Sequence, residues 1–340
     1  MKIIHIVRLV VPLLLCVGAG GSVAQGSVRM QGLVDMSVGS FQDAGRPRLR
    51  EAASGKLTTS YISISGTEDL GGAMHIDFAL AQFLRLDTGT NGRFNGDSFF
   101  ARDAYVSLRG GWGGLRLGRN TTPLFVATLV FNAFGDSFGF SPAIRQVFIP
   151  STGQPFLGDT GWNNSIRYAA PGVGGLTLVA TVNAAEGSAG STGRNASLGA
   201  LYFSGPLGAG ATWQQVKNGA FGVPAGWKSQ DALQAAGSYD FGPMKGFVQY
   251  TRVTTDALQS TDADIYSVGL AVPVRQGRFV VQYGHASADL GVATSTNRTL
   301  SAGYLHGLSK RTELYGVLMT DRLTARSTGN SAAAGVRHSF

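Results

Sequence analysis

Residues 28–38 read Val-Arg-Met-Gln-Gly-Leu-Val-Asp-Met-Ser-Val, and apolar side chains alternate with polar ones through most of this stretch. Successive side chains of a β-strand point to opposite faces, so the pattern predicts a strand with one apolar and one polar face. The apolar face would carry Val28, Met30, Val34, Met36 and Val38, and the polar face Arg29, Gln31, Asp35 and Ser37. The same alternation returns in residues 176–183 and 300–304.

Counted along the chain, this alternation predicts sixteen strands. We expect them near residues 27–39, 57–67, 72–85, 99–109, 112–119, 163–169, 175–184, 195–204, 207–217, 231–240, 244–254, 263–272, 277–288, 298–307, 311–321 and 331–340. The connections are alternately short and long. An even number of strands with tight turns on one rim and longer loops on the other is typical of an outer-membrane β-barrel.

The predicted fold is therefore all-β, a 16-stranded antiparallel transmembrane β-barrel. A soluble β-sandwich also alternates apolar and polar residues. At this length it would need two domains and a linker, and the sequence shows neither a linker nor a change of composition. The 49 glycines, combined with few charged residues, suit many short strands and tight turns.

The N-terminus has the pattern of an export signal. Lys2 and Arg8 precede or border an apolar run at 9–17, and the small residues 22–24 suit signal-peptidase cleavage after Ala24. Residues 1–24 are thus expected to be a cleaved signal peptide and 25–340 the barrel domain. Cys16 lies within the apolar run without the small preceding residues that a lipoprotein needs, so the mature chain would contain no cysteine.

Charge and motifs argue against several other functions. The net charge of +8 loses the two cations of the signal peptide, and the remaining cations are spread over the strands, so we expect no nucleic-acid partner. Outer-membrane hydrolases share the barrel architecture, but a catalytic group needs neighbouring residues. The histidines of the mature chain lie far apart, at His75, His285, His306 and His338. We predict no enzyme activity, no catalytic residues, no cofactor and no metal site.

One connection, residues 120–162, is far longer than is usual in a compact β domain. It carries an apolar run at 124–131 and further aromatic residues at Phe134, Phe138 and Phe140. So much apolar surface is costly to leave in water. The lumen of the barrel offers a sheltered place, so we expect this loop to fold inward and narrow the channel.

Six short motifs, spaced along the mature chain, resemble those of general trimeric porins of Gram-negative outer membranes, most closely the β-proteobacterial, neisserial-like branch. They are 65–72 (SGTEDLGG), 104–108 (AYVSL), 117–120 (LGRN), 164–168 (NSIRY), 308–312 (LSKRT) and 335–340 (GVRHSF). The resemblance implies a homotrimer of sixteen-stranded barrels. It also implies an inward-folded third external loop whose acidic residues face a ladder of cations on the wall.

Matched residue by residue, the resemblance implies wall cations at Arg119 and Arg167 and a loop acid at Asp136, with Asp159 as a second candidate. The strand alternation adds three lumen-facing cations, Arg29, Arg116 and Arg337. The chain departs from the family pattern where cations are usual on the second strand, since it has Tyr61 and Ser65 there. Arg145 also lies within the loop, whose acidic motif is reduced.

These observations predict an outer-membrane porin, a water-filled channel for passive diffusion of small hydrophilic solutes and ions. Wall cations outnumber the acids Asp136 and Asp35, so a modest preference for anions is expected. The alternative is a solute-specific channel with an aromatic and arginine track in the constriction. A surface-interaction barrel with a plugged lumen is a third possibility.

The expected partners follow from the outer-membrane location. Arg46, Arg48 and Arg50 form a basic cluster in the first external loop, where phosphates of lipopolysaccharide are a candidate partner besides the membrane lipid itself. The terminal Phe340 shares a face with Ala332, Ala334, Val336 and His338. In proteins of this kind the barrel assembly machinery reads such a terminal aromatic residue.

Overall fold

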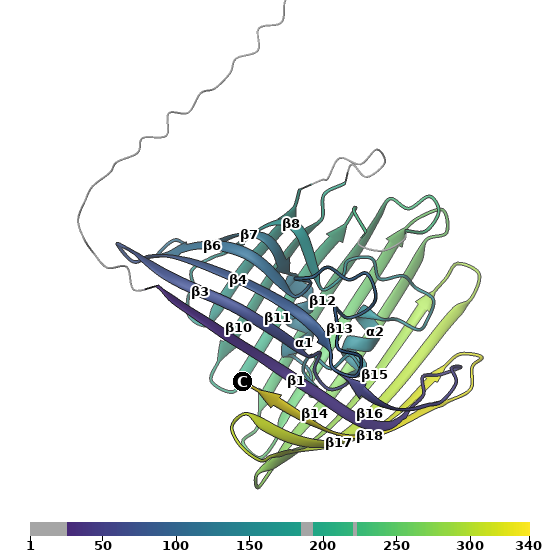
Figure 1. The fold of residues 1–340 in the computed structure, drawn as a ribbon. Coiled ribbons are helices and arrows are strands. Elements are labelled where there is room, and N and C mark those ends of the chain that lie inside the picture. The colour runs from purple at the N-terminus through teal and green to yellow at the C-terminus, as the bar shows by residue number, and fades with distance from the viewer. Residues whose placement is uncertain (1–25, 185–192, 220–222) are drawn as a thin grey trace, which may run out of the picture.

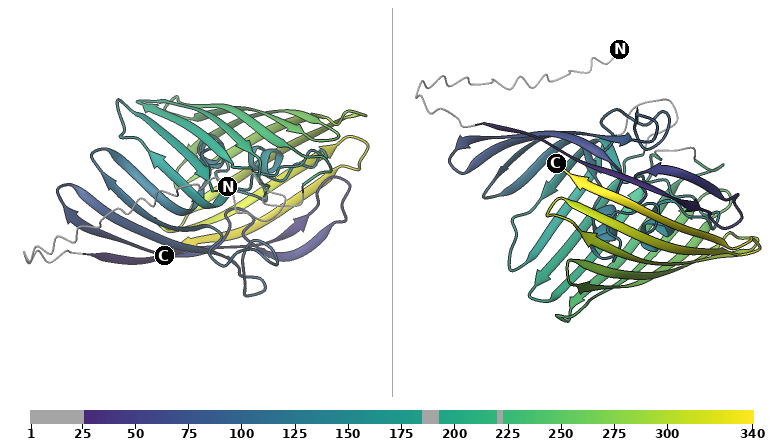
Figure 2. Two further views of the ribbon diagram at one scale, coloured as in Figure 1. Left: turned by 90° about the horizontal axis from the view of Figure 1, so that it is seen from above. Right: turned by 60° about the horizontal axis from the view of Figure 1, so that its bottom comes forward.

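The computed structural model describes residues 26–184, 193–219 and 223–340. The predicted signal peptide lies outside these residues. Within them the chain forms a closed antiparallel barrel (Figures 1 and 2). Of eighteen strands in the sheet, sixteen span the wall. They are β1 (Ser27–Phe41), β3 (Tyr61–Gly71), β4 (Met74–Arg85), β6 (Asp103–Gly110), β7 (Gly113–Thr121), β8 (Gly161–Ala169), β9 (Leu176–Asn183), β10 (Ala196–Ser204), β11 (Leu207–Val216), β12 (Ser229–Asp240), β13 (Lys245–Asp256), β14 (Thr261–Val274), β15 (Gly277–Asp289), β16 (Thr294–Gly307), β17 (Thr312–Leu323) and β18 (Gly329–Ser339).

The two remaining strands do not add to the wall count. β2 (Leu49–Ser54) pairs with the second half of β1, where β3 pairs with the first half, so β2 and β3 together make the second wall strand. The prediction at 57–67 therefore covers only part of this wall strand. The strand starts earlier, at Leu49, and is interrupted at 55–60. β5 (Thr90–Asn91) is a short pairing with the end of β4.

The barrel closes between its first and last strands. β1 pairs with β18 from Leu33 opposite Ser339 to Ser40 opposite Ala332. The backbones of Gly32 and Phe340 also exchange two hydrogen bonds of 3.1 Å. Closure leaves no unpaired strand edge in the membrane, where unsatisfied backbone groups would be costly. This closed wall excludes the β-sandwich.

The alternation of side chains matches the prediction from sequence. On β1 the apolar Val28, Met30 and Val38 are 71%, 67% and 64% exposed on the outer face, whereas Asp35 and Ser37 are buried on the inner face. Apolar residues on the outside and polar ones on the inside are the reverse of a soluble protein, and they suit a wall that lipid surrounds.

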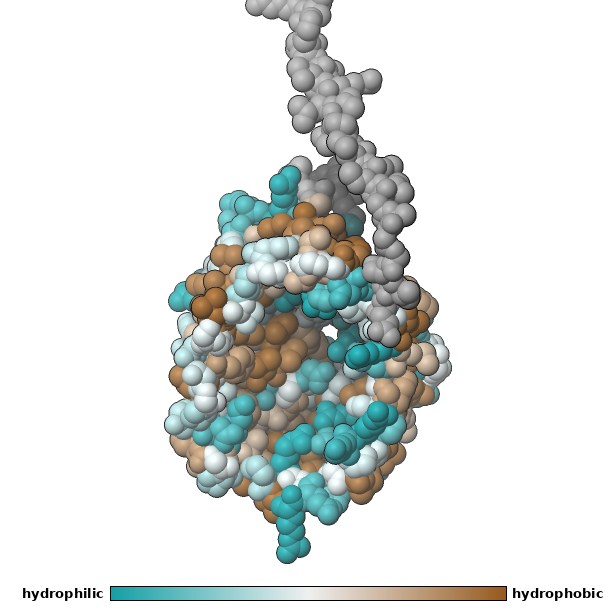
Figure 3. All heavy atoms as spheres, turned by 90° about the vertical axis from the view of Figure 1, so that its left-hand side faces the viewer, coloured by the Kyte–Doolittle hydropathy of each residue, from teal (hydrophilic) through white to brown (hydrophobic). Residues whose placement is uncertain are grey.

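The connections alternate as the sequence predicts. One rim carries tight turns, such as Gly72-Ala73 and Gly205-Pro206, and the other carries the longer loops. Gly72, Ala73 and Gly205 all have positive φ, which such tight turns require. Figure 3 shows the end of the barrel that carries the tight turns. A hollow with a small opening through it is visible there.

The longest connection, loop L3 (residues 122–160), contains both helices of the described chain. They are α1 (Pro123–Val130) and α2 (Pro142–Phe148). Each helix begins at a proline that follows a capping residue with a hydroxyl group. The Thr122 hydroxyl accepts a hydrogen bond from the Phe125 N–H, and the Ser141 hydroxyl accepts one from the Ile144 N–H. α1 contacts β9–β12 and α2 contacts β14–β16, and both lie within the ring of strands (Figure 1). Within the described residues no helix is long and apolar enough to cross a membrane.

Candidate functional site

Loop L3 is fastened to one half of the inner wall by glutamine side chains. Gln249 donates Nε2–H bonds to the carbonyl oxygens of Thr128 (2.9 Å) and Phe131 (2.7 Å), and Gln234 donates to the Thr128 hydroxyl (2.8 Å). Gln146 of α2 reaches Asn297 Oδ1 on β16 at 3.1 Å. The loop thereby covers the inner faces of β9–β16, and the buried carbonyl oxygens of Thr128 and Phe131 find donors there.

The middle of L3 is held on the opposite side by the interruption between β2 and β3. The Ser137 hydroxyl and the Gly139 N–H both donate to the carbonyl oxygen of Lys56, at 2.8 Å and 3.0 Å. Arg145, the cation within the loop, forms a 2.6 Å ion pair with Asp43 rather than facing open space. These contacts suspend L3 across the lumen.

Between L3 and strands β6–β8 lies a cavity of about 470 Å³, which we call the L3 cavity. Its loop side includes Phe125, Val126, Leu129, Asp136 and Phe138. Its wall side includes Arg102, Asp103, Arg116 and Arg167. Three of the predicted pore residues, Arg116, Arg167 and Asp136, therefore line one cavity.

Arg116 and Arg167 form the cationic centre of this wall. They lie directly opposite each other on β7 and β8, and Arg116 stacks on the Tyr105 ring with 4.3 Å to its centroid. Like charges in directly opposed positions destabilise a strand pair. Neither residue forms an ion pair within the described chain, although the charge of Arg116 interacts at longer range with Asp77 and Asp103.

Arg102 is a further cation at this site, and it was not among the residues predicted from the sequence. Its guanidinium lies 3.6 Å from the centroid of the Tyr61 ring and 3.9 Å from a carboxylate oxygen of Asp103. Tyr61 thus holds a cation where the family pattern places one on the second strand itself. Arg102 falls within the predicted strand at 99–109. The strand begins at Asp103, so Arg102 lies in the connection and can turn inward.

Asp136 is positioned by Thr58 and faces different cations from those expected. The Thr58 hydroxyl donates to Asp136 at 3.1 Å, and Thr58 in turn accepts a 2.7 Å bond from Arg337. Burial raises the pKa of Asp136 above its usual value of 3.8, although Thr58 and the charges of Arg102 and Arg337 oppose this. The acid is therefore protonated at a higher pH than an exposed aspartate.

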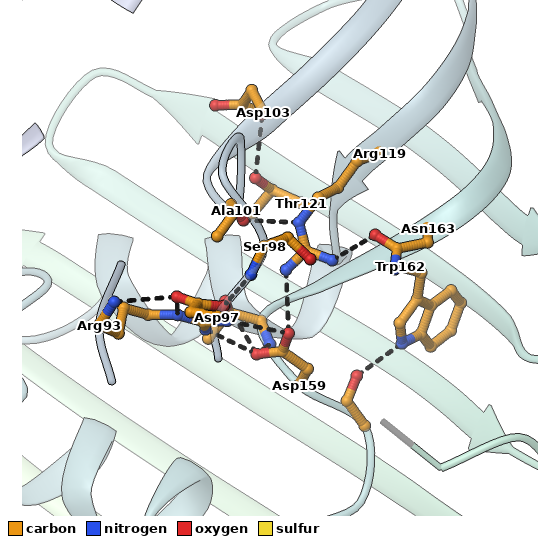
Figure 4. Close-up of polar contacts among 12 residues, drawn as sticks. Arg93, Asp97, Ser98, Ala101, Asp103, Arg119, Thr121, Asp159, Trp162 and Asn163 are labelled. Carbon is orange, nitrogen blue, oxygen red and sulfur yellow. Dashed lines mark hydrogen bonds and ion pairs between the residues drawn. The ribbon is translucent and has the colours of Figure 1, made fainter. Parts of the chain in front are cut away.

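The prediction for Arg119 needs correction. Its guanidinium does not face Asp136; it pairs with Asp159 at 2.9 Å and donates to Asn163 and to the Ala101 carbonyl (Figure 4). Asp159, the second candidate for the loop acid, is the partner of Arg119. A register shift between Gly118 and Asn120 lies at this point of β7, with Gly118 at φ +132°.

Arg119 belongs to a buried cluster that we call the clasp: Arg93, Asp97, Arg119 and Asp159. Arg93 pairs with Asp97 at 2.9 Å and with Asp159 at 2.7 Å, which joins the loop after β4 to the end of L3 (Figure 4). Burial alone would raise the pKa of Asp159. The hydrogen bond from Arg93 and the charges of Arg93 and Arg119 outweigh burial and lower that pKa below 3.8. The clasp is electrically balanced and serves to fasten the loops.

The remaining predicted residues lie apart from the L3 cavity. Arg29 lies on the inner face of β1, opposite Ser65 of β3. Arg337 forms an ion pair with Glu313, which also binds Arg278 at 2.8 Å. Asp35 is fully buried and accepts a 3.1 Å hydrogen bond from the Tyr315 hydroxyl. No cluster of three or more potential metal ligands occurs among the described residues.

Comparison with known proteins identifies this architecture. A family model described as Gram-negative porin matches residues 13–326. The chain is a Gram-negative porin. Among curated porins it is 31% identical to outer membrane porin protein 32 of Delftia acidovorans, covering 94% of this chain and 90% of the relative. It is 25% identical to an outer membrane porin protein of Bordetella pertussis, covering 95% and 96%.

Solved porins share its fold. The anion-selective porin from Comamonas acidovorans matches with a TM-score of 0.78 and 26% identity, covering 93% of this chain and all of that one. OmpT of Vibrio cholerae in its trimer form matches with a TM-score of 0.70 at 14% identity, covering 93% and 99%. This porin therefore forms a channel through the outer membrane for passive diffusion of small hydrophilic solutes.

Proposed function

We propose that this porin prefers anions, and that Arg116, Arg167 and Arg102 set the preference at the L3 cavity. The observation that carries the proposal is the unpaired arginine couple Arg116–Arg167 facing L3. Some other lumen cations are paired with an acid, as Arg109 is with Asp77 at 2.7 Å. An ion in a narrow aqueous gap beside a low-dielectric wall responds more strongly to charge than in bulk water. The similar Comamonas porin is described as anion-selective.

The test is the reversal potential of purified protein in planar bilayers under a potassium chloride gradient. The double variant Arg116→Ser, Arg167→Ser should lower the chloride-to-potassium permeability ratio about fivefold, if the two charges together contribute on the order of 1 kcal/mol at an effective dielectric of about 20 in the screened gap. The shift should shrink at molar salt because screening becomes short-ranged. An unchanged reversal potential at low salt would refute the assignment.

The outer face offers a matched control for this experiment. Arg298 and Arg322 are likewise directly opposite each other, on β16 and β17. They share their face with the lipid-exposed Leu300 and Leu318. The double variant Arg298→Ser, Arg322→Ser removes the same charge from outside the lumen, so it should leave the reversal potential unchanged.

We further propose that three barrels assemble into a homotrimer. Small side chains on the outer face, such as Ala332 and Ala334, allow walls to approach closely. The Vibrio cholerae protein of the same fold is described in a trimer form. Cross-linking in mild detergent should yield trimers, and cross-linking that stops at the monomer would contradict this.

Two partners are proposed from the surface. Arg46, Arg48 and Arg50 are exposed near the loop rim, with Arg48 hydrogen-bonded to Gln42, and we propose that they contact lipopolysaccharide phosphates. Replacing all three by serine should reduce co-purified lipopolysaccharide.

The second partner is the barrel assembly machinery, which we propose recognises Phe340. This residue is 43% exposed on the outer face, and its deletion should lower the yield of assembled barrel. We propose no catalytic activity for this porin.

A further inference from the structure

We propose that the channel favours small carboxylates that carry an aromatic ring, which bind in the L3 cavity with the ring against L3 and the carboxylate against the arginine wall. This inference rests on the proposed function, because it requires an anion-preferring channel, and it names the class of solute. The two sides of the cavity differ in chemistry, and each side matches one part of such a molecule.

The loop side of the cavity is apolar, although the cavity belongs to an aqueous lumen in which polar side chains are usual. α1 buries Leu124, Ala127 and Thr128 against the wall, yet its opposite face carries Phe125, Val126 and Leu129, which are only partly buried. Phe138 adds a further ring to this surface. Apolar surface kept facing an aqueous lumen is costly unless it serves for binding. A solute with an apolar ring would cover it favourably.

The apolar surface continues beyond the L3 cavity towards the loop rim. A second cavity of about 410 Å³ is lined by Phe138, Phe148 and Phe156, and it shares Thr59, Arg93, Phe138 and Thr160 with the L3 cavity. We call it the rim cavity. The shared residues show that the two cavities adjoin. A solute entering from the loops would meet these three phenylalanines before it reaches Arg116 and Arg167.

Ring contacts connect these phenylalanines into one track. Phe156 and Phe148 are edge to face with centroids 4.8 Å apart, and Phe148 and Phe125 are edge to face at 5.1 Å. Phe125 and Phe138 follow at 5.9 Å. Edge-to-face packing leaves ring faces and edges available to a further ring, which gains about 0.5–1.5 kcal/mol per aromatic contact beyond area burial.

The wall side supplies donors for a carboxylate. Arg116 and Arg167 have no ion-pair partner in the described chain, and the Nε of Arg167 is buried without a hydrogen-bond partner. Guanidinium groups bind carboxylates through paired hydrogen bonds. Asp103 and Asp136 also line the cavity and would repel the solute, but Asp103 lies beside Arg102 and Asp136 is engaged by Thr58.

The experiment compares benzoate with acetate, which shares the carboxylate but lacks the ring. Reversal potentials of the full mature protein in planar bilayers, with chloride on the opposite side, give the two permeabilities at neutral pH. Free diffusion through a wide pore favours acetate because it is the smaller ion. The proposal expects benzoate to permeate at least as well as acetate.

A double variant tests the aromatic side. Phe125→Ser with Phe138→Ser should lower the benzoate-to-acetate ratio roughly two- to tenfold, the range that one aromatic contact contributes. The matched control is Phe99→Ser with Phe100→Ser. These two rings pack edge to face at 4.9 Å, are 57% and 36% exposed, and line neither cavity. The control should keep the wild-type ratio.

The outcomes separate this inference from the proposed function. If chloride is preferred over potassium but benzoate permeates less than acetate, with no change in the double variant, the solute class is wrong and the anion preference stands. If chloride is not preferred over potassium, the proposed function itself fails. Should the double variant not assemble, the wild-type ratio alone decides, because a value below one overturns the proposal.

Discussion

The two halves of the inner wall are both polar, but they use their polar groups differently. On β9–β16 the inward glutamines and threonines are buried beneath L3 and bind its backbone, as Gln249 does at Phe131. On β6–β8 two inward side chains, Arg116 and Arg167, lie opposite each other and line the L3 cavity without an ion-pair partner among the described residues. One half stabilises the loop that the other half faces. We therefore expect substitutions in the covered half to change stability and those in the open half to change selectivity.

The largest effect is expected where L3 is fastened at its end, in the clasp. Asp159→Asn removes a carboxylate whose side chain is 8% exposed and leaves Arg93 and Arg119 with less compensation. Breaking a buried ion pair typically costs about 3–5 kcal/mol. The temperature at which the barrel loses its heat-modifiable gel mobility should fall markedly. Asp256→Asn, which removes an exposed pair with Lys228, should change it little.

The clasp also predicts how stability depends on pH. The pKa of Asp159 is below 3.8 in the folded protein, so its contribution is fully present above that value and is lost as pH falls through the lower folded pKa. The wild-type and Asp159→Asn unfolding temperatures should converge only in strong acid. A difference that already disappears at pH values well above the usual aspartate range would contradict the proposed role of the clasp.

A smaller loss is expected from Gln249→Leu in the covered half. It leaves the carbonyl oxygen of Phe131 without its donor, which costs about 1–3 kcal/mol for a buried group. Single-channel recordings should show noisier conductance as L3 loosens, with the same ion preference. Gln215→Leu, at a residue that binds Asp231 on the outer face, is the matched control. A changed ion preference in Gln249→Leu would contradict the expectation that the covered half affects stability and not selectivity.

Across the L3 cavity from the open half, Asp136 of L3 should make the ion preference depend on pH. Its raised pKa means that it is protonated at higher pH than an exposed aspartate, so its negative charge is lost as pH falls through that raised value. The reversal potential should then move further towards anions. Asp136→Asn should show this stronger anion preference already at neutral pH, and should flatten the pH dependence above the usual aspartate range. If the reversal potential of Asp136→Asn depends on pH as that of the wild type does, another titrating group is responsible.

The smallest effect is expected at Tyr61. Its ring holds Arg102 at 3.6 Å, an interaction of about 0.5–1 kcal/mol at a partly exposed site. Tyr61→Leu should weaken the anion preference slightly, by less than a factor of about five, without changing the unfolding temperature measurably. The test is the same reversal potential at low salt. A variant with unchanged preference would show that Arg102 keeps its position without the ring.

The sequence by itself determined the barrel, because strand alternation and connection length are local properties. The period of two placed Val28 outside and Asp35 inside without any knowledge of their neighbours, and it placed Arg116 in the lumen. Only the tertiary structure decided which charges remain free. Arg119 and Arg167 both matched family motifs. A register shift beside Gly118 and contacts with residues up to 44 positions away place Arg119 in the clasp, whereas Arg167 lines the L3 cavity. Charge pairing depends on distances between segments remote in sequence, so no local pattern could have separated the two.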